Sequence, residues 1–336
     1  MLKLTRQQFL TLALGTTLTT VALRKEHQVI AAPSSPAIEP LPSWQAGKVK
    51  TKILAFVERV TTPNHPDFVP VENRIAVFDN DGTLWAEQPY VQLIFLQNQL
   101  QKLVKTQPEI AEKQPYKAAL AGNTAYFAQA GEKTIMEIIM ATSANRTDGQ
   151  FRAEVEAFFQ TAKHPTLGFE MTRVVYQPML ELLAYLRSQG FQTWICSGGG
   201  IDFMRIISQA FYGIPPQQVI GSSLKKEFRL QSGKGVIWRL PEIGTINDKE
   251  TKPVNIALHI GKHPIVAVGN VKSGGDIAML RYSQAQSPSL QLLVNHDDDG
   301  REFAYQEKDQ ASLTAAKEND WSVISMKQDW KQIFKT

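Results

Sequence analysis

The fold can be inferred from one stretch of sequence, Ile75-Ala76-Val77-Phe78-Asp79-Asn80-Asp81-Gly82-Thr83-Leu84-Trp85. An apolar run rich in β-formers leads directly into two carboxylates one residue apart and then a glycine, which predicts a buried strand ending in a polar loop. Open α/β sheets bind ligands at such strand ends. Two carboxylates there suit a divalent cation and nucleophilic attack. An acidic turn, with Gly82 at positive φ, is the alternative interpretation.

The rest of the chain alternates between strand and helix patterns on either side of a helical block. Strands are predicted at 192–196, 219–224, 264–269, 290–294 and 321–325, with helices between them and a hairpin over 226–240. This alternation predicts a doubly wound, mainly parallel, Rossmann-like sheet. The block at 86–172 contains only helical patterns, so we expect an inserted helical domain there. It either covers the site as a cap or is a plain bundle, and the α/β core then comprises 48–85 and 173–336.

The N-terminus differs in character from the core. Lys3 and Arg6 precede an apolar run, and small residues follow near Ala31, so residues 1–31 resemble a secretory signal peptide. We therefore expect an exported protein, periplasmic or secreted, with an uncleaved membrane anchor as the alternative. Residues 32–47 are rich in Pro and Ser at their start and are predicted to be a linker.

Composition and charge narrow the function classes. Hydrophobic residues make up 43% and charged residues 20% of the 336 residues, which is ordinary for a globular protein. The net charge is +4, but residues 1–31 hold four basic residues and one acidic, so 32 basic and 31 acidic residues remain beyond them. That balance argues against nucleic-acid binding. The single cysteine, Cys196, excludes an intramolecular disulfide and a cysteine-based metal site.

Three further polar segments stand where ligands could bind. Ser197-Gly198-Gly199-Gly200 follows a predicted strand and opens a helix, where backbone N–H groups and the serine hydroxyl can hold a phosphate. Lys252 stands at the start of another helix, with a solvated charged turn as the alternative. The segment 269–280 follows a buried strand and carries Asn270 and Asp276, whose side-chain oxygens can ligate Mg²⁺.

These four segments, in this order, resemble the four signatures of the haloacid dehalogenase-like (HAD) superfamily, and the resemblance is closest to its phosphoserine phosphatase-like branch. It implies a HAD core with a helical cap and an Mg²⁺-dependent phosphatase acting on a small phosphorylated metabolite. Position by position, it makes Asp79 the nucleophile, Asp81 the general acid and base, and Lys252 the partner of the phosphoryl group. Ser197 and Gly198 would bind phosphate, and the implied metal ligands are Asp79, Asp81, Asn270 and Asp276.

One departure from the superfamily pattern concerns the metal. Asn270 stands where an aspartate is expected, and its amide oxygen brings no charge to Mg²⁺. A HAD-like protein that binds a phosphorylated ligand without turnover is therefore one alternative, and a phosphotransferase is another. Glu87 and Arg205 are candidates for substrate recognition, although for both an exposed surface charge is the simpler interpretation. No partner other than a small substrate is expected, and the membrane enters only if the N-terminal segment is uncleaved.

Overall fold

The computed structural model describes residues 39–130, 132–272 and 274–335. The predicted signal peptide lies outside these residues, as do residues 32–38 of the predicted linker. Within the described part of the chain, no helix has both the length and the apolar character needed to cross a membrane. The core and the inserted block described below belong to one compact unit, which begins at Pro40.

The core is a mostly parallel sheet, as the sequence predicts. Its strand order is β2-β5-β4-β3-β1-β6-β7-β8. The six consecutive strands β4-β3-β1-β6-β7-β8 are parallel to one another. At one edge, β5 pairs antiparallel with β4, and β2 pairs antiparallel with β5. The strands are β1 (Ile75–Phe78), β2 (Arg146–Thr147), β3 (Gln192–Gly200), β4 (Val219–Gln231), β5 (Lys234–Thr245), β6 (Val266–Asn270), β7 (Leu290–Asn295) and β8 (Ser322–Ser325).

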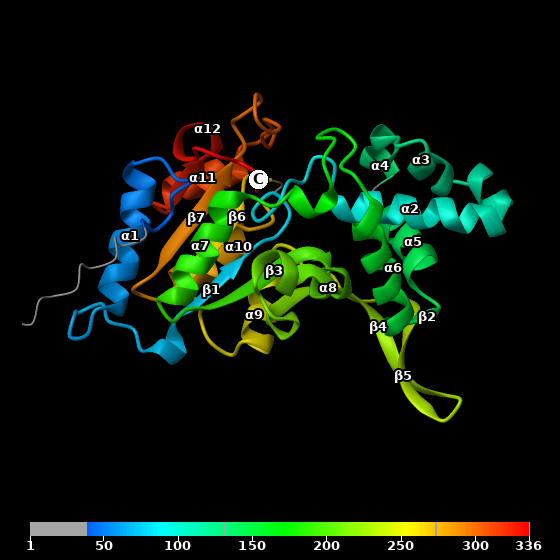
Figure 1. Cartoon of the computed structure of the whole chain (residues 1–336), viewed down its shortest axis with the longest axis horizontal. Helices are drawn as coiled ribbons and strands as arrows, with labels where there is room; N and C mark the ends of the chain where they lie inside the picture. The colour runs from blue at the N-terminus through cyan, green and yellow to red at the C-terminus, as the bar shows by residue number, and fades with distance from the viewer. Residues whose placement is uncertain (1–38, 131, 273, 336) are drawn as a thin grey trace, which may run out of the picture. The chain divides into compact units, whose positions relative to one another are not determined.

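Helices cover both faces of this sheet (Figure 1). In β1, Ala76 and Phe78 point into one hydrophobic cluster, and Ile75 and Val77 point into the other, because successive side chains alternate between the faces of a strand. The first cluster is closed by α1 (Lys48–Thr61), α7 (Gln177–Ser188) and α8 (Ile201–Tyr212), and the second by α9 (Thr251–His259), α10 (Ile277–Gln284) and α11 (Ala311–Glu318). The doubly wound α/β fold is thereby confirmed.

The inserted block follows the loop after β1 and is almost entirely helical. It contains α2 (Val91–Thr106), α3 (Tyr116–Leu120), α4 (Thr124–Ala130), α5 (Glu132–Ser143) and α6 (Asp148–Thr161). The sequence pattern over 118–128 is helical and predicts one helix, but α3 and α4 are separate because Gly122 between them adopts a φ of 64°. The sequence also did not reveal β2, because two residues carry no recognisable periodicity.

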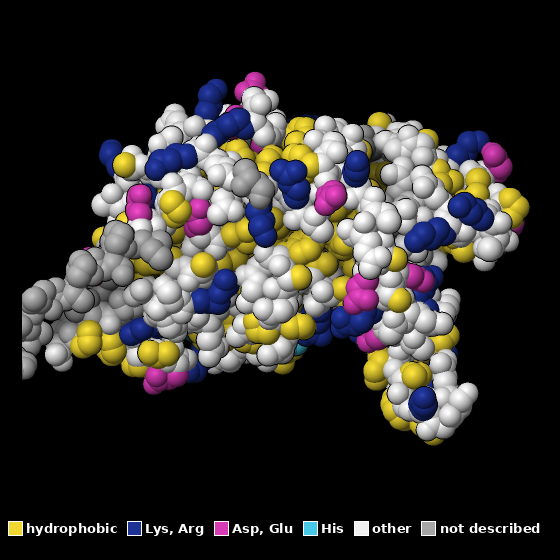
Figure 2. All heavy atoms as spheres, viewed as in Figure 1, with side chains coloured by type: hydrophobic (Ala, Val, Ile, Leu, Met, Phe, Trp, Pro, Cys, Tyr) yellow, Lys and Arg dark blue, Asp and Glu magenta, His cyan; other side chains and the backbone are white. Residues whose placement is uncertain are grey.

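A long hairpin joins the core to the inserted block. β4 and β5 continue beyond the parallel sheet, and β5 pairs with β2 through Arg146 and Thr147. In Figure 1 the hairpin projects beside α5 and α6, and Figure 2 shows hydrophobic side chains at its tip. Phe228 and Leu230 are among the exposed ones. The inserted block therefore pairs with a strand from a segment far along the chain, which helical periodicity at 86–172 could not indicate.

The N- and C-terminal segments of the described chain differ from their predicted structures. The end of the predicted linker packs into the core through Leu41 and Trp44. Trp44 is fully buried, and its ring nitrogen donates a hydrogen bond to the Pro178 carbonyl at 2.9 Å. The sequence pattern over 328–334 predicts a last helix, but α12 spans only Met326–Asp329. The chain is extended beyond it because Trp330 and Phe334 form bridges with Trp44 and Tyr176.

Candidate active site

The two carboxylates of the opening motif lie where β1 ends. β1 runs between β3 and β6, and its four residues are buried, so its carboxyl end is the point at which polar groups can face a ligand. The Asp79 backbone N–H donates to the Val268 carbonyl of β6 at 2.9 Å, which holds Asp79 in the sheet. The following turn is closed by a 2.8 Å hydrogen bond from the Leu84 N–H to the Asn80 carbonyl.

Gly82 serves this loop in two ways. Its φ of 74° lies in the left-handed region that glycine tolerates. A Cβ atom at this position would also stand only 1.9 Å from the amide nitrogen of Asn270. The glycine therefore makes the turn and lets Asn270 approach the loop, so the motif does more than form an acidic turn.

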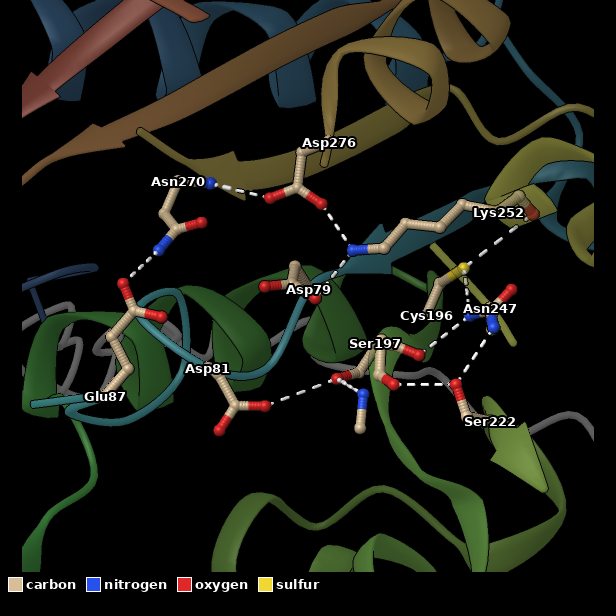
Figure 3. Close-up of polar contacts among 12 residues, drawn as sticks. Asp79, Asp81, Glu87, Cys196, Ser197, Ser222, Asn247, Lys252, Asn270 and Asp276 are labelled. Atoms are coloured by element: carbon tan, nitrogen blue, oxygen red, sulfur yellow. Dashed lines mark hydrogen bonds and ion pairs between the residues drawn. The ribbon is translucent and has the colours of Figure 1, made fainter. Parts of the chain in front are cut away.

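Lys252, at the start of α9, connects two buried carboxylates (Figure 3). Its Nζ donates to Asp79 Oδ1 at 2.8 Å and also to Asp276 Oδ1. Burial, and then the charge of Asp276, raise the pKa of Asp79 well above its ordinary range, and Lys252 opposes that shift. Burial alone would lower the pKa of Lys252, but Asp276 and Asp79 outweigh it and raise the pKa. Lys252 is thus a permanent cation beside Asp79, as the family pattern implies.

Asp81 lies two residues beyond Asp79 and is less enclosed. Trp85 Nε1 donates to its Oδ1 at 2.9 Å, and the Ser197 hydroxyl lies 3.5 Å from its Oδ2. Burial raises the pKa of Asp81 to about 6, while the hydrogen bond from Trp85 opposes the shift. A carboxyl group with that pKa can both give and take a proton near neutral pH.

The glycine segment after Cys196 lies across from these aspartates. The sequence predicted that the strand ends at Cys196, but β3 continues to Gly200, with an irregular register before Gly200 pairs with Ser222 of β4. The Ser197 hydroxyl accepts a hydrogen bond from the Gly199 N–H at 3.0 Å, so Ser197 shapes the segment itself. Asn247 fixes it from the other side, donating to the Ser197 carbonyl at 2.8 Å.

A residue of the inserted block also reaches this segment. The Gln92 side chain, from α2, accepts a hydrogen bond from the Gly200 N–H at 2.8 Å. A Cβ atom on Gly199 would stand 2.1 Å from the Gln92 amide nitrogen, so this contact requires glycine there. Nothing in the sequence around Gln92 indicated such a role. α2 is therefore part of the site and not a separate bundle.

Glu87 and Asn270 form a buried pair on the opposite side of Asp79 (Figure 3). The Asn270 side-chain amide donates to Glu87 Oε1 at 3.1 Å, and Lys272 Nζ lies 3.0 Å from Glu87 Oε2. Only 2% of Glu87 is exposed, so its interpretation as an exposed charge was wrong. The loop between β1 and α2 folds back over β6, which a sequence pattern does not show. Lys272 was inside the predicted metal-binding segment but was not singled out.

The oxygen atoms around Asp79 fit a hard divalent cation. Its Oδ2 has no hydrogen-bond partner within the described ranges, and Figure 3 shows the Asn270 amide oxygen on the side facing Asp79. Four carboxylates (Asp79, Asp81, Glu87 and Asp276) line the cavity here with two ammonium groups (Lys252 and Lys272), leaving a formal excess of negative charge that a divalent cation would offset.

Two observations limit the ligand set. Each oxygen of Asp276 already accepts a hydrogen bond, one from Lys252 and one from the Asn270 N–H. Both oxygens of Asp276 are thus engaged in holding Lys252 and the Asn270 backbone, which limits its role as a metal ligand. No cluster of three His, Cys, Asp or Glu side chains with metal-binding geometry occurs in 39–130, 132–272 or 274–335, so a cation would depend on amide and backbone oxygens as well.

The site opens into a cavity of about 410 Å³ between the strand ends and the inserted block. Asp79, Asp81, Ser197, Lys252 and Asn270 all line it, so the structure brings the four predicted segments together. Arg205 does not line it. Its guanidinium donates to the carbonyls of Pro216 and Val219, at 3.0 and 3.4 Å, so we withdraw it as a substrate-binding candidate.

The fold and this site define an α/β protein whose candidate reacting group is an aspartate at a strand end. The chain belongs to the haloacid dehalogenase-like hydrolase family, whose pattern matches residues 76–281. The family resemblance inferred from the four segments is confirmed, and with it the HAD-type core.

Solved structures from several bacteria are similar to this chain in fold. A conserved, functionally unknown protein from Anaerococcus prevotii is 16% identical, with a TM-score of 0.53 over 82% of this chain and 91% of that one. A protein with unknown function from Bordetella pertussis is 15% identical, with a TM-score of 0.47 over 75% and 98%. A probable phosphoserine phosphatase from Vibrio cholerae is 14% identical, with a TM-score of 0.40 over 77% and 62%. No curated protein sequence matches the chain.

Proposed function

We propose that this protein is an Mg²⁺-dependent phosphomonoester hydrolase that acts on a small phosphorylated compound through an aspartyl-phosphate. One observation carries the proposal. Asp79 faces the cavity with one carboxylate oxygen bound to Lys252 and the other without a hydrogen-bond partner among the described residues. A carboxylate held in this way has an oriented oxygen available to attack phosphorus.

In the first step, Asp79 Oδ2 forms a bond to phosphorus as the bond to the leaving oxygen breaks. Asp81 gives its proton to that oxygen, and the alcohol departs. The Lys252 ammonium stabilises the charge on the phosphoryl oxygens and remains paired with Asp276. The Gly198 N–H adds a hydrogen-bond donor for the same oxygens, since the Gly199 and Gly200 N–H groups already donate to Ser197 and Gln92.

In the second step, Asp81, now a carboxylate, takes a proton from a water molecule. The resulting hydroxide attacks phosphorus, the bond to Asp79 breaks, and inorganic phosphate leaves. The pKa of about 6 suits Asp81 to both roles. When bound, Mg²⁺ supplies charge stabilisation for the phosphoryl group, and the residues that would hold it are Asp79, the Asp81 carbonyl and Asn270.

The test is phosphate release from a phosphomonoester panel, assayed with Mg²⁺ and with EDTA. We expect release that EDTA abolishes and that Asp79→Asn abolishes with preserved folding. The matched control is Asp67→Asn, which changes a partly exposed aspartate whose ion-pair partner among the described residues is Arg59, and it should leave the rate unchanged. Normal turnover of p-nitrophenyl phosphate by Asp79→Asn would refute the assignment.

Asn270 supports a second candidate, a HAD-like protein that binds a phosphorylated ligand without turnover. Its amide oxygen brings no charge to a cation. Binding of a phosphate analogue without any phosphate release would favour this candidate. A phosphotransferase would instead reveal itself if added glycerol diverted the phosphoryl group from water to glycerol.

A further inference from the structure

The half of the cavity on the side of the inserted block is lined largely by apolar side chains. Most of these come from helices of the inserted block and from α8: Leu93, Leu96, Met136, Ile139, Phe151 and Phe203. Ligand pockets recognise the apolar part of a small molecule with such a lining. If the phosphoryl group lies at Asp79, this half faces the leaving group.

Among the described residues, Arg239 is the one cation that lines this half of the cavity, and its guanidinium already has partners. Arg239 of β5 is 4% exposed, and its Nη1 pairs with both Asp202 and Asp148. Its Nε donates to the Ser143 carbonyl at 2.8 Å, and its guanidinium carbon lies 3.9 Å from the centre of the Phe151 ring. Burial alone would raise the pKa of Asp202, but Arg239 and Lys226 lower it, so the pair is ionised.

The other two cations of the lining are also paired. Lys252 binds Asp79 and Asp276, and Lys272 binds Glu87. Within the described residues, no lysine or arginine of the cavity is left to receive a carboxylate or a second phosphate. Burying an anion without a partner is costly, so an anionic leaving group would be rejected.

We propose that the leaving group of the substrate is apolar and carries no negative charge, because the apolar lining lies beside an arginine and two lysines that already have carboxylate partners. This inference rests on the proposed phosphatase function and specifies its substrate class: monoesters of an alkyl or aryl alcohol. It sets aside phosphorylated acids, amino acids and sugars.

The kinetic test uses alkyl phosphates, whose leaving alcohols have similar chemistry. We expect kcat/KM to rise roughly fourfold for each methylene group added from ethyl to hexyl phosphate, which corresponds to ~0.8 kcal/mol per buried methylene. 3-Phosphoglycerate, O-phosphoserine and glycerol 1-phosphate should be poorer substrates than hexyl phosphate. Phosphate release that is fastest from any of these three would overturn the inference while leaving the phosphatase function standing.

A binding measurement tests the same inference without turnover. Calorimetry with Mg²⁺ present compares hexylphosphonate with 5-carboxypentylphosphonate, which has a carboxylate in place of the terminal methyl group. We expect hexylphosphonate to bind at least tenfold more tightly. Equal affinity, or tighter binding of the carboxylate, would overturn the inference even if the protein proved to be a binding protein.

Leu93→Arg provides a charge test, because Leu93 lines the cavity and is 42% exposed, so the substitution can be accommodated. It should weaken hexylphosphonate binding and strengthen carboxypentylphosphonate binding. The matched control is Leu230→Arg, at a 70% exposed leucine of the hairpin, and it should change neither affinity. If Leu93→Arg has an unaltered melting temperature and still shows the same ratio of affinities for the two phosphonates, the result would count against the cavity as their binding site.

Discussion

Moving the negative charge of the Glu87–Asn270 pair from position 87 to position 270 should preserve the stability that Asn270→Asp alone lowers. In the native pair, the Asn270 amide donates to Glu87 Oε1 at 3.1 Å, which turns the amide oxygen toward Asp79. The double variant Glu87→Gln/Asn270→Asp reverses the donor and the acceptor. It keeps both the hydrogen bond and the formal charge of the pair, whereas each single variant changes that charge.

The magnitude follows from the distance. Asn270→Asp alone brings a second carboxylate to 3.1 Å from Glu87. At an effective dielectric constant of about 20, two like charges at that distance repel by about 5 kcal/mol. Lys272, at 3.0 Å from Glu87, is not enough to balance both carboxylates. We therefore expect Asn270→Asp to lose about 3 kcal/mol in free energy of unfolding without metal, and the double variant to recover most of it.

The assay is urea unfolding in EDTA, repeated with saturating Mg²⁺. Mg²⁺ should stabilise Asn270→Asp more than the native protein, because the cation offsets the added repulsion. Glu242→Gln, which removes an exposed carboxylate paired with Lys225, is the control and should be nearly neutral. The reasoning is refuted if Asn270→Asp is as stable as the native protein in EDTA, or if the double variant is no more stable than Asn270→Asp.

Two further predictions concern the charges at Asp79 and Asp81. Lys252→Met should abolish phosphate release and lower the free energy of unfolding by about 3–5 kcal/mol, because it leaves buried carboxylates without a cation. Urea unfolding measures this loss of stability. The double variant Lys252→Met/Asp79→Asn should recover part of it. Since the pKa of Asp81 is raised to about 6, its acid form disappears as the pH rises through that value. The rate of hexyl phosphate hydrolysis should therefore fall above pH 6. The rate of p-nitrophenyl phosphate hydrolysis should fall less, because its leaving group needs little protonation. Equal declines of the two rates would argue against Asp81 as the acid.

The sequence predicted those parts of the fold and site that depend on neighbouring residues along the chain. β1 could be recognised because its apolar run ends at Asp79, and Lys252 because it begins a helix. The burial of Glu87 could not be recognised, since it depends on the loop after β1 bringing Glu87 against Asn270 of β6. Gln92 carries no local signal either, because its role exists only once α2 lies against Gly200. Strand ends can be recognised from a local sequence pattern, whereas contacts between distant segments of the chain produce no such pattern.

The contact between Gln92 and Gly200 gives the inserted block a part in the chemistry. α2 supplies both Gln92, which binds the phosphate-side glycine segment, and Leu93, which lines the apolar half of the cavity. Adjacent residues of one helix therefore face the two ends of the proposed substrate. An apolar leaving group that packs against α2 also holds Gln92 against Gly200, so its binding energy can orient the groups around the phosphoryl oxygens. The same arrangement explains why substrates lacking that apolar part should lose kcat as well as affinity.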